Sequence, residues 1–240
     1  RKPLLLAMAV VLVLVGILYA QLTSAATYTW DNGGGDNLWS TCTNWSSNIC
    51  PGSGDIARFT SATTSDSIID SGFGGSVLGI DIDSGYTGTI TQQRNVTITS
   101  SGFVQDVGVF QQGDYGFTMF DGSFAQNGGT FTTASGGSNS TDRSFTVGAS
   151  ATFISSSTKI LLFNGVNTSD NSTFNYPGTF PGTVDLAKGR SETSFTLATG
   201  VIARMADSST CASNVVINEG ATLHAANNVY TMQNFPVHGF

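Results

Sequence analysis

Apolar and polar residues alternate in short segments that recur along the chain at nearly constant spacing. In the stretch 96–131 the pattern nearly repeats itself 21 residues later, so that Phe103 corresponds to Phe124. Alternation over a few residues indicates a strand with one buried face. A fixed period of about 20 residues is typical of coils stacked into a solenoid. The other equivalent pairs are Val96 with Phe117, Ile98 with Met119, Gln105 with Gln126, Gly108 with Gly129, Phe110 with Phe131 and Phe124 with Phe145.

The same pattern predicts strands on both sides of this repeat. A coil of about 21 residues holds about three short strands and three corners. We therefore expect residues 62–240 to form an all-β, parallel β-solenoid. Within it, Gln105 lies above Gln126, either in an amide ladder or as a polar corner. The predicted strands include 67–69, 80–82, 89–91, 96–98, 117–119, 145–147, 195–197 and 215–217.

Two segments, 139–142 and 164–183, disturb the period. The second contains Pro177 and Pro181. Because proline removes a ladder donor, we predict that this segment protrudes as a loop between coils. Inserted loops on one face of a solenoid are where binding is often found.

Residues 27–61 precede the coils and contain all three tryptophans, Trp30, Trp39 and Trp45. The first coil of a stack has an unpaired edge and an open apolar end, both of which must be covered. We therefore predict an N-terminal aromatic cap with buried tryptophans. In the alternative, the three side chains are exposed and form a glycan-binding platform.

The cap segment also resembles a known group of proteins. Its pattern is Trp30…Gly35…Trp39…Asn44-Trp45…Pro51…Gly54-Asp55-x-Ala57-x-Phe59. This resembles the opening of exported bacterial β-helical surface proteins with autotransporter-type β-strand repeats. The resemblance implies a right-handed parallel β-helix at the cell surface. It transfers no active-site residue, because that family is defined by its scaffold.

Cys42 and Cys50 flank a loop within the cap. In an exported chain such a pair indicates a disulfide. A zinc site is the alternative, but no second cysteine pair and no histidine lie nearby in the sequence. Cys211 is left without an assigned partner.

Residues 1–26 have the composition of a secretory leader. Arg1 and Lys2 precede an uncharged apolar run, and small residues follow it up to Ala26. This order predicts a helical signal peptide, with an uncleaved membrane anchor as the alternative. The missing initiator Met and the abrupt end suggest a chain truncated at its C-terminus. We expect an extracellular or cell-surface location, with membrane contact only through the leader or a missing C-terminal part.

Composition narrows the range of partners. Charged residues make up 10% of the chain, against about 25% in ordinary domains, and the net charge is −7. Phosphate binding needs clustered Lys and Arg, so a nucleic-acid partner is not expected. Glycans, or surface proteins of a host or neighbouring cell, are compatible with this composition.

The sequence contains few residues that suggest chemistry. It has no nucleophile elbow, zincin, P-loop or dinucleotide motif, and we assign no catalytic residue. The densest acids include Asp81 and Asp83. On adjacent coils, carboxylates can bind Ca²⁺ or act on a polysaccharide. These two alternate with Ile80 and Ile82, however, which favours solvated surface acids.

Together these patterns favour a non-enzymatic, secreted or cell-surface β-solenoid. It would be an adhesin-like passenger or structural segment that presents binding loops. The alternative is a carbohydrate-binding protein, or a polysaccharide lyase or hydrolase, on the same scaffold.

Overall fold

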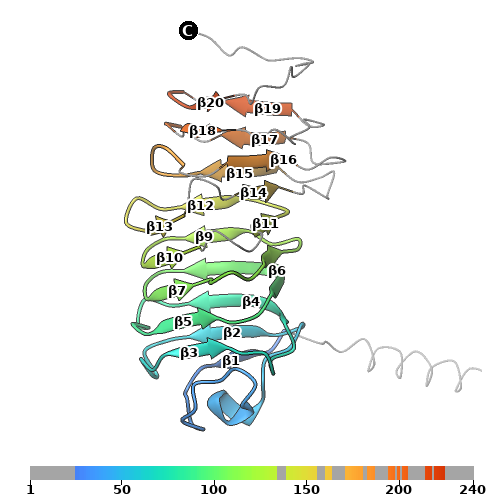
Figure 1. The fold of residues 1–240 in the computed structure, drawn as a ribbon, viewed down its shortest axis with the longest axis vertical. Coiled ribbons are helices and arrows are strands. Elements are labelled where there is room, and N and C mark those ends of the chain that lie inside the picture. Colours follow the sequence, from blue (N-terminus) through green and yellow to red (C-terminus); the bar gives the residue numbers. More distant parts are fainter. Residues whose placement is uncertain are drawn as a thin grey trace, which may run out of the picture.

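The computed structural model describes residues 25–133, 139–155, 160–163, 171–180, 183–186, 194–197, 199–200, 202–204, 214–217 and 219–224. The described strands pair in parallel and form a β-solenoid, with successive coils lying one above another (Figure 1). Three walls surround one core. The described helical structure consists of two short 3₁₀ turns, η1 (Cys42–Asn44) and η2 (Ser46–Asn48).

The first wall aligns one buried apolar residue of each coil with that of the next. Phe103 pairs with Phe124, and Phe124 with Phe145. Their rings are stacked, with centroids 5.0 Å and 4.5 Å apart. The strands of this wall are β1 (Thr27–Thr29), β2 (Ile56–Phe59), the second halves of β4 (Ser76–Ile82) and β6 (Val96–Gln105), β9 (Phe124–Gln126), β12 (Phe145–Val147), β15 (Asn171–Asn175), β17 (Ser194–Leu197) and β19 (Asn214–Ile217).

The second wall repeats this arrangement with its own aromatic column. Phe110 and Phe131 stack at 4.9 Å, and Phe131 and Phe153 at 5.5 Å. A separate strand pair, β18 with β20, lies further along the chain. The strands are β3 (Ser67–Ile69), β5 (Thr89–Gln92), β7 (Val109–Gln111), β10 (Thr130–Thr132) and β13 (Thr152–Ile154), followed by β18 (Ile202–Arg204) and β20 (Thr222–His224).

The third wall shares β4 and β6 with the first, because both strands turn the corner between the walls. In β6 the corner lies at Gly102, which has φ +70°, and a Cβ there would lie 2.4 Å from the carbonyl oxygen of Ser123. Only glycine fits this conformation and this approach. The wall contains the first halves of β4 and β6, then β8 (Phe117–Met119), β11 (Asn139–Thr141), β14 (Ile160–Phe163) and β16 (Thr183–Leu186).

The core lies where the three walls face one another. Phe103 of the first wall meets Phe110 of the second and Phe117 of the third edge to face, each with centroids 5.4 Å apart. The predicted solenoid, its three strands per coil and its 21-residue register in this region are therefore confirmed.

Gln105 and Gln126 lie inside the solenoid, one above the other and fully buried. Their side chains do not form the amide ladder. Instead, Nε2 of Gln126 donates to the carbonyl oxygens of Gly129 at 3.2 Å and Thr152 at 3.0 Å. Gln105 donates in the same way to the corner that follows it. The polar-corner interpretation is confirmed: these side chains give a second hydrogen bond to corner carbonyls such as that of Gly129, which also accepts from the N–H of Thr152.

The two segments that disturb the period belong to the walls. Residues 139–141 form β11, paired with β8 and β14. Phe180 is buried and contacts Phe174 at 5.2 Å, while Thr179 bridges to Ile202. The protruding-loop prediction is therefore wrong for residues 171–180, because their aromatic side chains complete the core. Phe174 nevertheless lies 29 residues after its partner Phe145, so this coil is longer than the two coils directly before it.

Some predictions concern residues outside the described part of the chain. They include the signal peptide, of which the structure describes only the last two residues, and Cys211. The domain boundaries at residues 26 and 61 also stay predictions. Among the described residues, no helix has the length and apolar character needed to span a membrane.

Candidate functional site

The cap tryptophans form a closed cluster at one end of the solenoid. Trp30, Trp39 and Trp45 have no exposed surface. Trp45 meets each of the other two edge to face at 5.1 Å, and Phe59 of the first coil packs against all three. The predicted buried cap is confirmed. The alternative of a glycan platform at these residues is contradicted, because a fully buried ring has no face to offer a sugar.

Hydrogen bonds fix the orientation of this cluster. Nε1 of Trp39 donates to the Ser67 hydroxyl at 2.6 Å, and Nε1 of Trp45 donates to the Trp39 carbonyl at 3.0 Å. Because Ser67 belongs to β3, the first of these bonds ties the cap to the second wall. The cap is therefore attached to the coils by polar contacts as well as by aromatic packing.

Asn44 organises the loop that enters the cap. Its buried side chain accepts hydrogen bonds from the N–H groups of Gly34 and Gly35, and donates to the Asp36 carboxylate and the Leu38 carbonyl. These bonds use its full donor and acceptor capacity. The sequence showed this residue only as part of the cap pattern.

The predicted disulfide is present between Cys42 and Cys50, whose Cα atoms lie 4.5 Å apart. It closes the segment that contains η1, η2 and Trp45. The zinc alternative is contradicted, since both sulfur atoms are used in the bond.

Asp81 and Asp83 lie on the outer side of the first wall, beside Arg58 of the preceding coil. The Arg58 guanidinium is 3.4 Å from Asp81 and 2.5 Å from Asp83. Burial raises the pKa of Asp81, as does the neighbouring Asp83 charge, whereas Arg58 acts in the opposite direction. A Ca²⁺ ion at this place would have to compete with the guanidinium. Within the described ranges, no three or more His, Cys, Asp or Glu side chains gather as a metal site.

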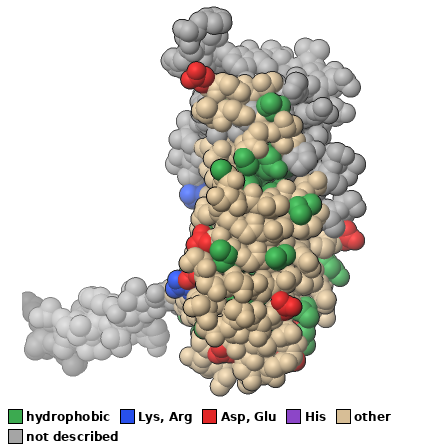
Figure 2. All heavy atoms as spheres, turned by 90° about the vertical axis from the view of Figure 1, so that its left-hand side faces the viewer, with side chains coloured by type: hydrophobic (Ala, Val, Ile, Leu, Met, Phe, Trp, Pro, Cys, Tyr) green, Lys and Arg blue, Asp and Glu red, His purple; other side chains and the backbone are tan. Residues whose placement is uncertain are grey.

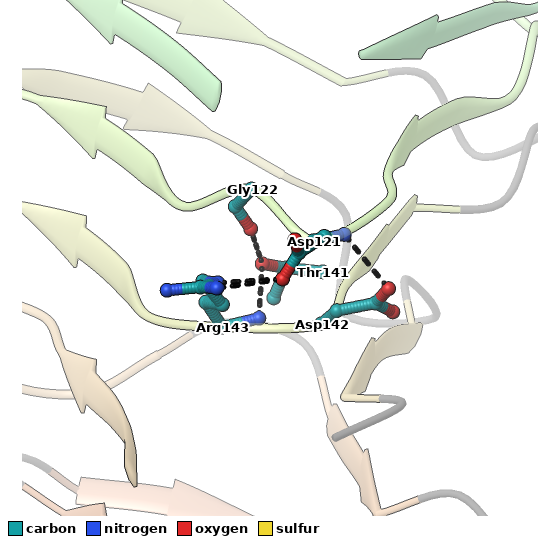
Figure 3. Close-up of polar contacts among 5 residues, drawn as sticks. All are labelled: Asp121, Gly122, Thr141, Asp142 and Arg143. Atoms are coloured by element: carbon teal, nitrogen blue, oxygen red, sulfur yellow. Dashed lines mark hydrogen bonds and ion pairs between the residues drawn. The ribbon is translucent and has the colours of Figure 1, made fainter. Parts of the chain in front are cut away.

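A second charged cluster joins neighbouring corners between the third and first walls (Figure 3). The Arg143 guanidinium donates to Oδ1 of Asp121 at 2.7 Å and 2.9 Å, and the N–H of Asp121 donates to Oδ2 of Asp142 at 2.9 Å. Asp142 is 3% exposed, and its Oδ1 has no hydrogen-bond partner. Sequence reasoning missed these residues, although the disturbed period at 139–142 marked the place.

The side chains of Asp121, Thr141 and Arg143 link two successive coils, and we call this group the clamp. Arg143 and Asp121 belong to successive coils, and Thr141 accepts a hydrogen bond from the N–H of Arg143 while donating to the Gly122 carbonyl. The side chains thus satisfy corner groups that the strand ladder leaves unpaired. Arg58 of β2 and Asp83 of the next coil are likewise joined by an ion pair between their side chains.

Comparison of the chain with protein-family models, curated proteins and solved structures gives no significant match.

Proposed function

We propose that the protein is a secreted or cell-surface β-solenoid that acts as an adhesin-like passenger or structural segment and is not an enzyme. The observation that carries this proposal is the parallel ladder of the first wall, which runs from β1 in the cap to β19. A parallel ladder advances by about 4.8 Å per coil, so each added coil lengthens the same rigid rod. Such a rod holds its outer surface and corners away from an attachment point.

The cap supports a location outside the cytoplasm. A disulfide that closes a short surface segment persists in oxidising compartments. The leader-like composition of residues 1–26 points in the same direction. Both features agree with export, and they are independent of each other.

Binding would be carried by the outer surface and the long coil. The coil between Phe145 and Phe174 has 29 residues from one partner to the next, against 21 in the two coils directly before it. Additional residues in one coil of a solenoid are placed at corners, where they can contact a partner without breaking the ladder. Glycans and surface proteins of neighbouring cells are the partner classes that this composition allows.

Export is tested by expressing the full chain, with and without residues 1–26, in a bacterium that secretes heterologous proteins. We expect the full chain outside the cytoplasm with the Cys42–Cys50 bond formed, as shown by thiol labelling. The chain without the leader should stay inside. Retention of both forms in the cytoplasm would overturn the proposed location.

Adhesion is tested with beads coated with the purified protein, offered to cells and to a glycan array. Binding to cells or glycans that is lost when residues 164–170 are shortened would support presentation by the long coil. Absence of binding to every cell type and glycan would overturn the adhesin-like part of the proposal. Turnover of a polysaccharide by the protein would instead establish the enzymatic alternative.

A further inference from the structure

From β5 to β13, the outer side of the second wall differs in its geometry from the neighbouring strands β8, β9 and β12 of the other two walls. Strands β7, β10 and β13 have an outward, inward, outward pattern, so each contributes two outward side chains. Strands β8, β9 and β12 have the reverse pattern and contribute one. With β5, the second wall therefore carries two parallel rows, which we call the two-row face. The rows are Thr89, Val109, Thr130 and Thr152, and Thr91, Gln111, Thr132 and Ile154.

The side chains of the two-row face are chemically uniform. All except Gln111 are β-branched, and five are threonines. β-Branched side chains are stiff about χ1, so their methyl and hydroxyl groups are held in fixed positions. Every one of the eight is at least partly exposed.

Strand geometry makes these positions a lattice. Neighbouring strands lie about 4.8 Å apart, and residues i and i+2 of one strand lie about 6.6 Å apart. The pairings between β5, β7, β10 and β13 run without a register shift, whereas β4 and β6 shift between Val77 and Gly79. Methyl groups stand at seven of the eight positions of this lattice, and hydroxyl groups at the five threonines.

Charge narrows the choice of partner for this lattice. Strands β5, β7, β10 and β13 contain no charged residue, although the whole chain has a net charge of −7. On the side of the solenoid shown in Figure 2, few of the described side chains are charged. An uncharged face is complementary to an uncharged partner that repeats with similar spacing. None of the outward side chains is aromatic, so the face lacks the rings on which sugars stack.

We propose that the two-row face binds the surface of ice. Ordered water is uncharged, repeats in two dimensions at distances of this order, and accepts and donates hydrogen bonds to hydroxyl groups. The methyl groups exclude loosely held water, while the rigid hydroxyl groups join the lattice. This activity goes beyond the proposed scaffold function and does not depend on export, so failure of one leaves the other standing.

The test uses the purified full chain in an ice-recrystallisation assay and in observations of single ice crystals. We expect the wild-type protein to shape crystals and to slow recrystallisation. Thr130→Tyr places a ring in the middle of the two-row face and should weaken the effect roughly tenfold, the loss typical of a disrupted central contact. Tyrosine is well tolerated in strands, so folding should be preserved.

Thr118→Tyr is the matched control. Thr118 is the single outward residue of β8 on the third wall, partly exposed like Thr130. It should leave the effect on ice unchanged, and circular dichroism should show the same fold for both variants. A wild-type protein without effect on ice would overturn the proposal, as would equal losses in the two variants. Sedimentation with an insoluble neutral polysaccharide, lost in Thr130→Tyr alone and without any effect on ice, would assign the face to that polymer instead.

Discussion

The tryptophan cluster of the cap and the phenylalanine columns of the coils are both buried, but they are assembled differently. In the cap, Trp45 meets Trp30 and Trp39 at interplanar angles of 75° and 89°. In the coils, Phe103 and Phe124 are inclined by 16°. The cap is a single arrangement of unlike neighbours, whereas each coil repeats the environment of the next.

Because of this difference, the coils and the cap are stabilised by different contacts. A coil is held by its ladders and by the same side chains above and below it, so its stability is shared with its neighbours. The cap has coils on one side only. It relies instead on a disulfide, on the buried Asn44 network and on hydrogen bonds to the first coils. Damage to the cap should therefore stay near one end, and damage to a middle coil should spread in both directions.

The largest effect is expected from Phe124→Ala. Phe124 stacks between Phe103 and Phe145 and meets Phe131 of the second wall. Removing a buried phenylalanine leaves a cavity and should lower the free energy of unfolding by about 3–5 kcal/mol. Chemical denaturation followed by circular dichroism measures it. The control Phe124→Leu retains most of the volume, and a loss as large as that of Phe124→Ala would contradict the cavity argument.

Trp45→Ala removes a similarly buried side chain from the cap. It should lower the free energy of unfolding of the cap by about 3–5 kcal/mol. Because the cap lies at one end, hydrogen exchange should increase in β1, β2 and β3 and stay unchanged in β10 and β13. In Phe124→Ala, by contrast, protection should fall on both sides of β9. Loss of protection throughout the solenoid in Trp45→Ala would show that the coils need the cap to stay folded.

Reduction of the Cys42–Cys50 bond, or the double change of both residues to Ser, should come next in size. The bond joins residues eight apart in sequence, and closing a loop of that size is worth about 2.5 kcal/mol in the chain-entropy model. All three tryptophans are in the cap, so their fluorescence reports on it directly. Equal fluorescence transitions in the oxidised and reduced protein would show that Asn44 and the aromatic packing alone hold the loop.

Gln126→Leu tests the buried polar corner of the coils. There, as in the cap, a buried side chain is held by its own hydrogen bonds. The change removes the two Nε2 hydrogen bonds to the carbonyl oxygens of Gly129 and Thr152, while Gly129 keeps the bond from the N–H of Thr152. Two lost hydrogen bonds should cost about 1–3 kcal/mol. Denaturation measures the loss. The matched change Thr146→Val, on the outward side of β12, should have little effect, and an equal loss there would argue against a specific role of the amide.

The sequence predicted the coils better than the cap or the clamp. The 21-residue repeat allowed the partners of Phe103, Phe110 and Val96 on the next coil to be predicted, because a register error would turn apolar side chains outward. The register of the 29-residue coil could not be predicted, because Phe174, which pairs with Phe145, lies outside the 21-residue period. The clamp between Asp121 and Arg143 depends on corner geometry, which no period encodes.

The smallest effect is expected from Asp70, which joins the cap to the end of β3. Its carboxylate accepts hydrogen bonds from the N–H and hydroxyl of Ser40 and from the N–H of Gly72. Burial acts to raise the pKa of Asp70, but these hydrogen bonds outweigh it, and the pKa lies below its ordinary value of 3.8.

The sign of the pH dependence follows from that direction. The native state binds fewer protons than the unfolded state, so the contribution is complete above the ordinary pKa and is lost as the pH falls below it. Asp70→Asn should therefore flatten the decline in cap stability between pH 5 and pH 3, at a cost of roughly 1 kcal/mol near neutral pH. Tryptophan fluorescence during denaturation follows the cap, and circular dichroism follows the coils. If fluorescence showed the same pH dependence of cap stability in the variant and the wild type, the acid sensitivity of the cap would come from another carboxylate. Asp36 is the first to test, because its pKa is also lowered, mainly by the hydrogen bond from the Thr41 hydroxyl.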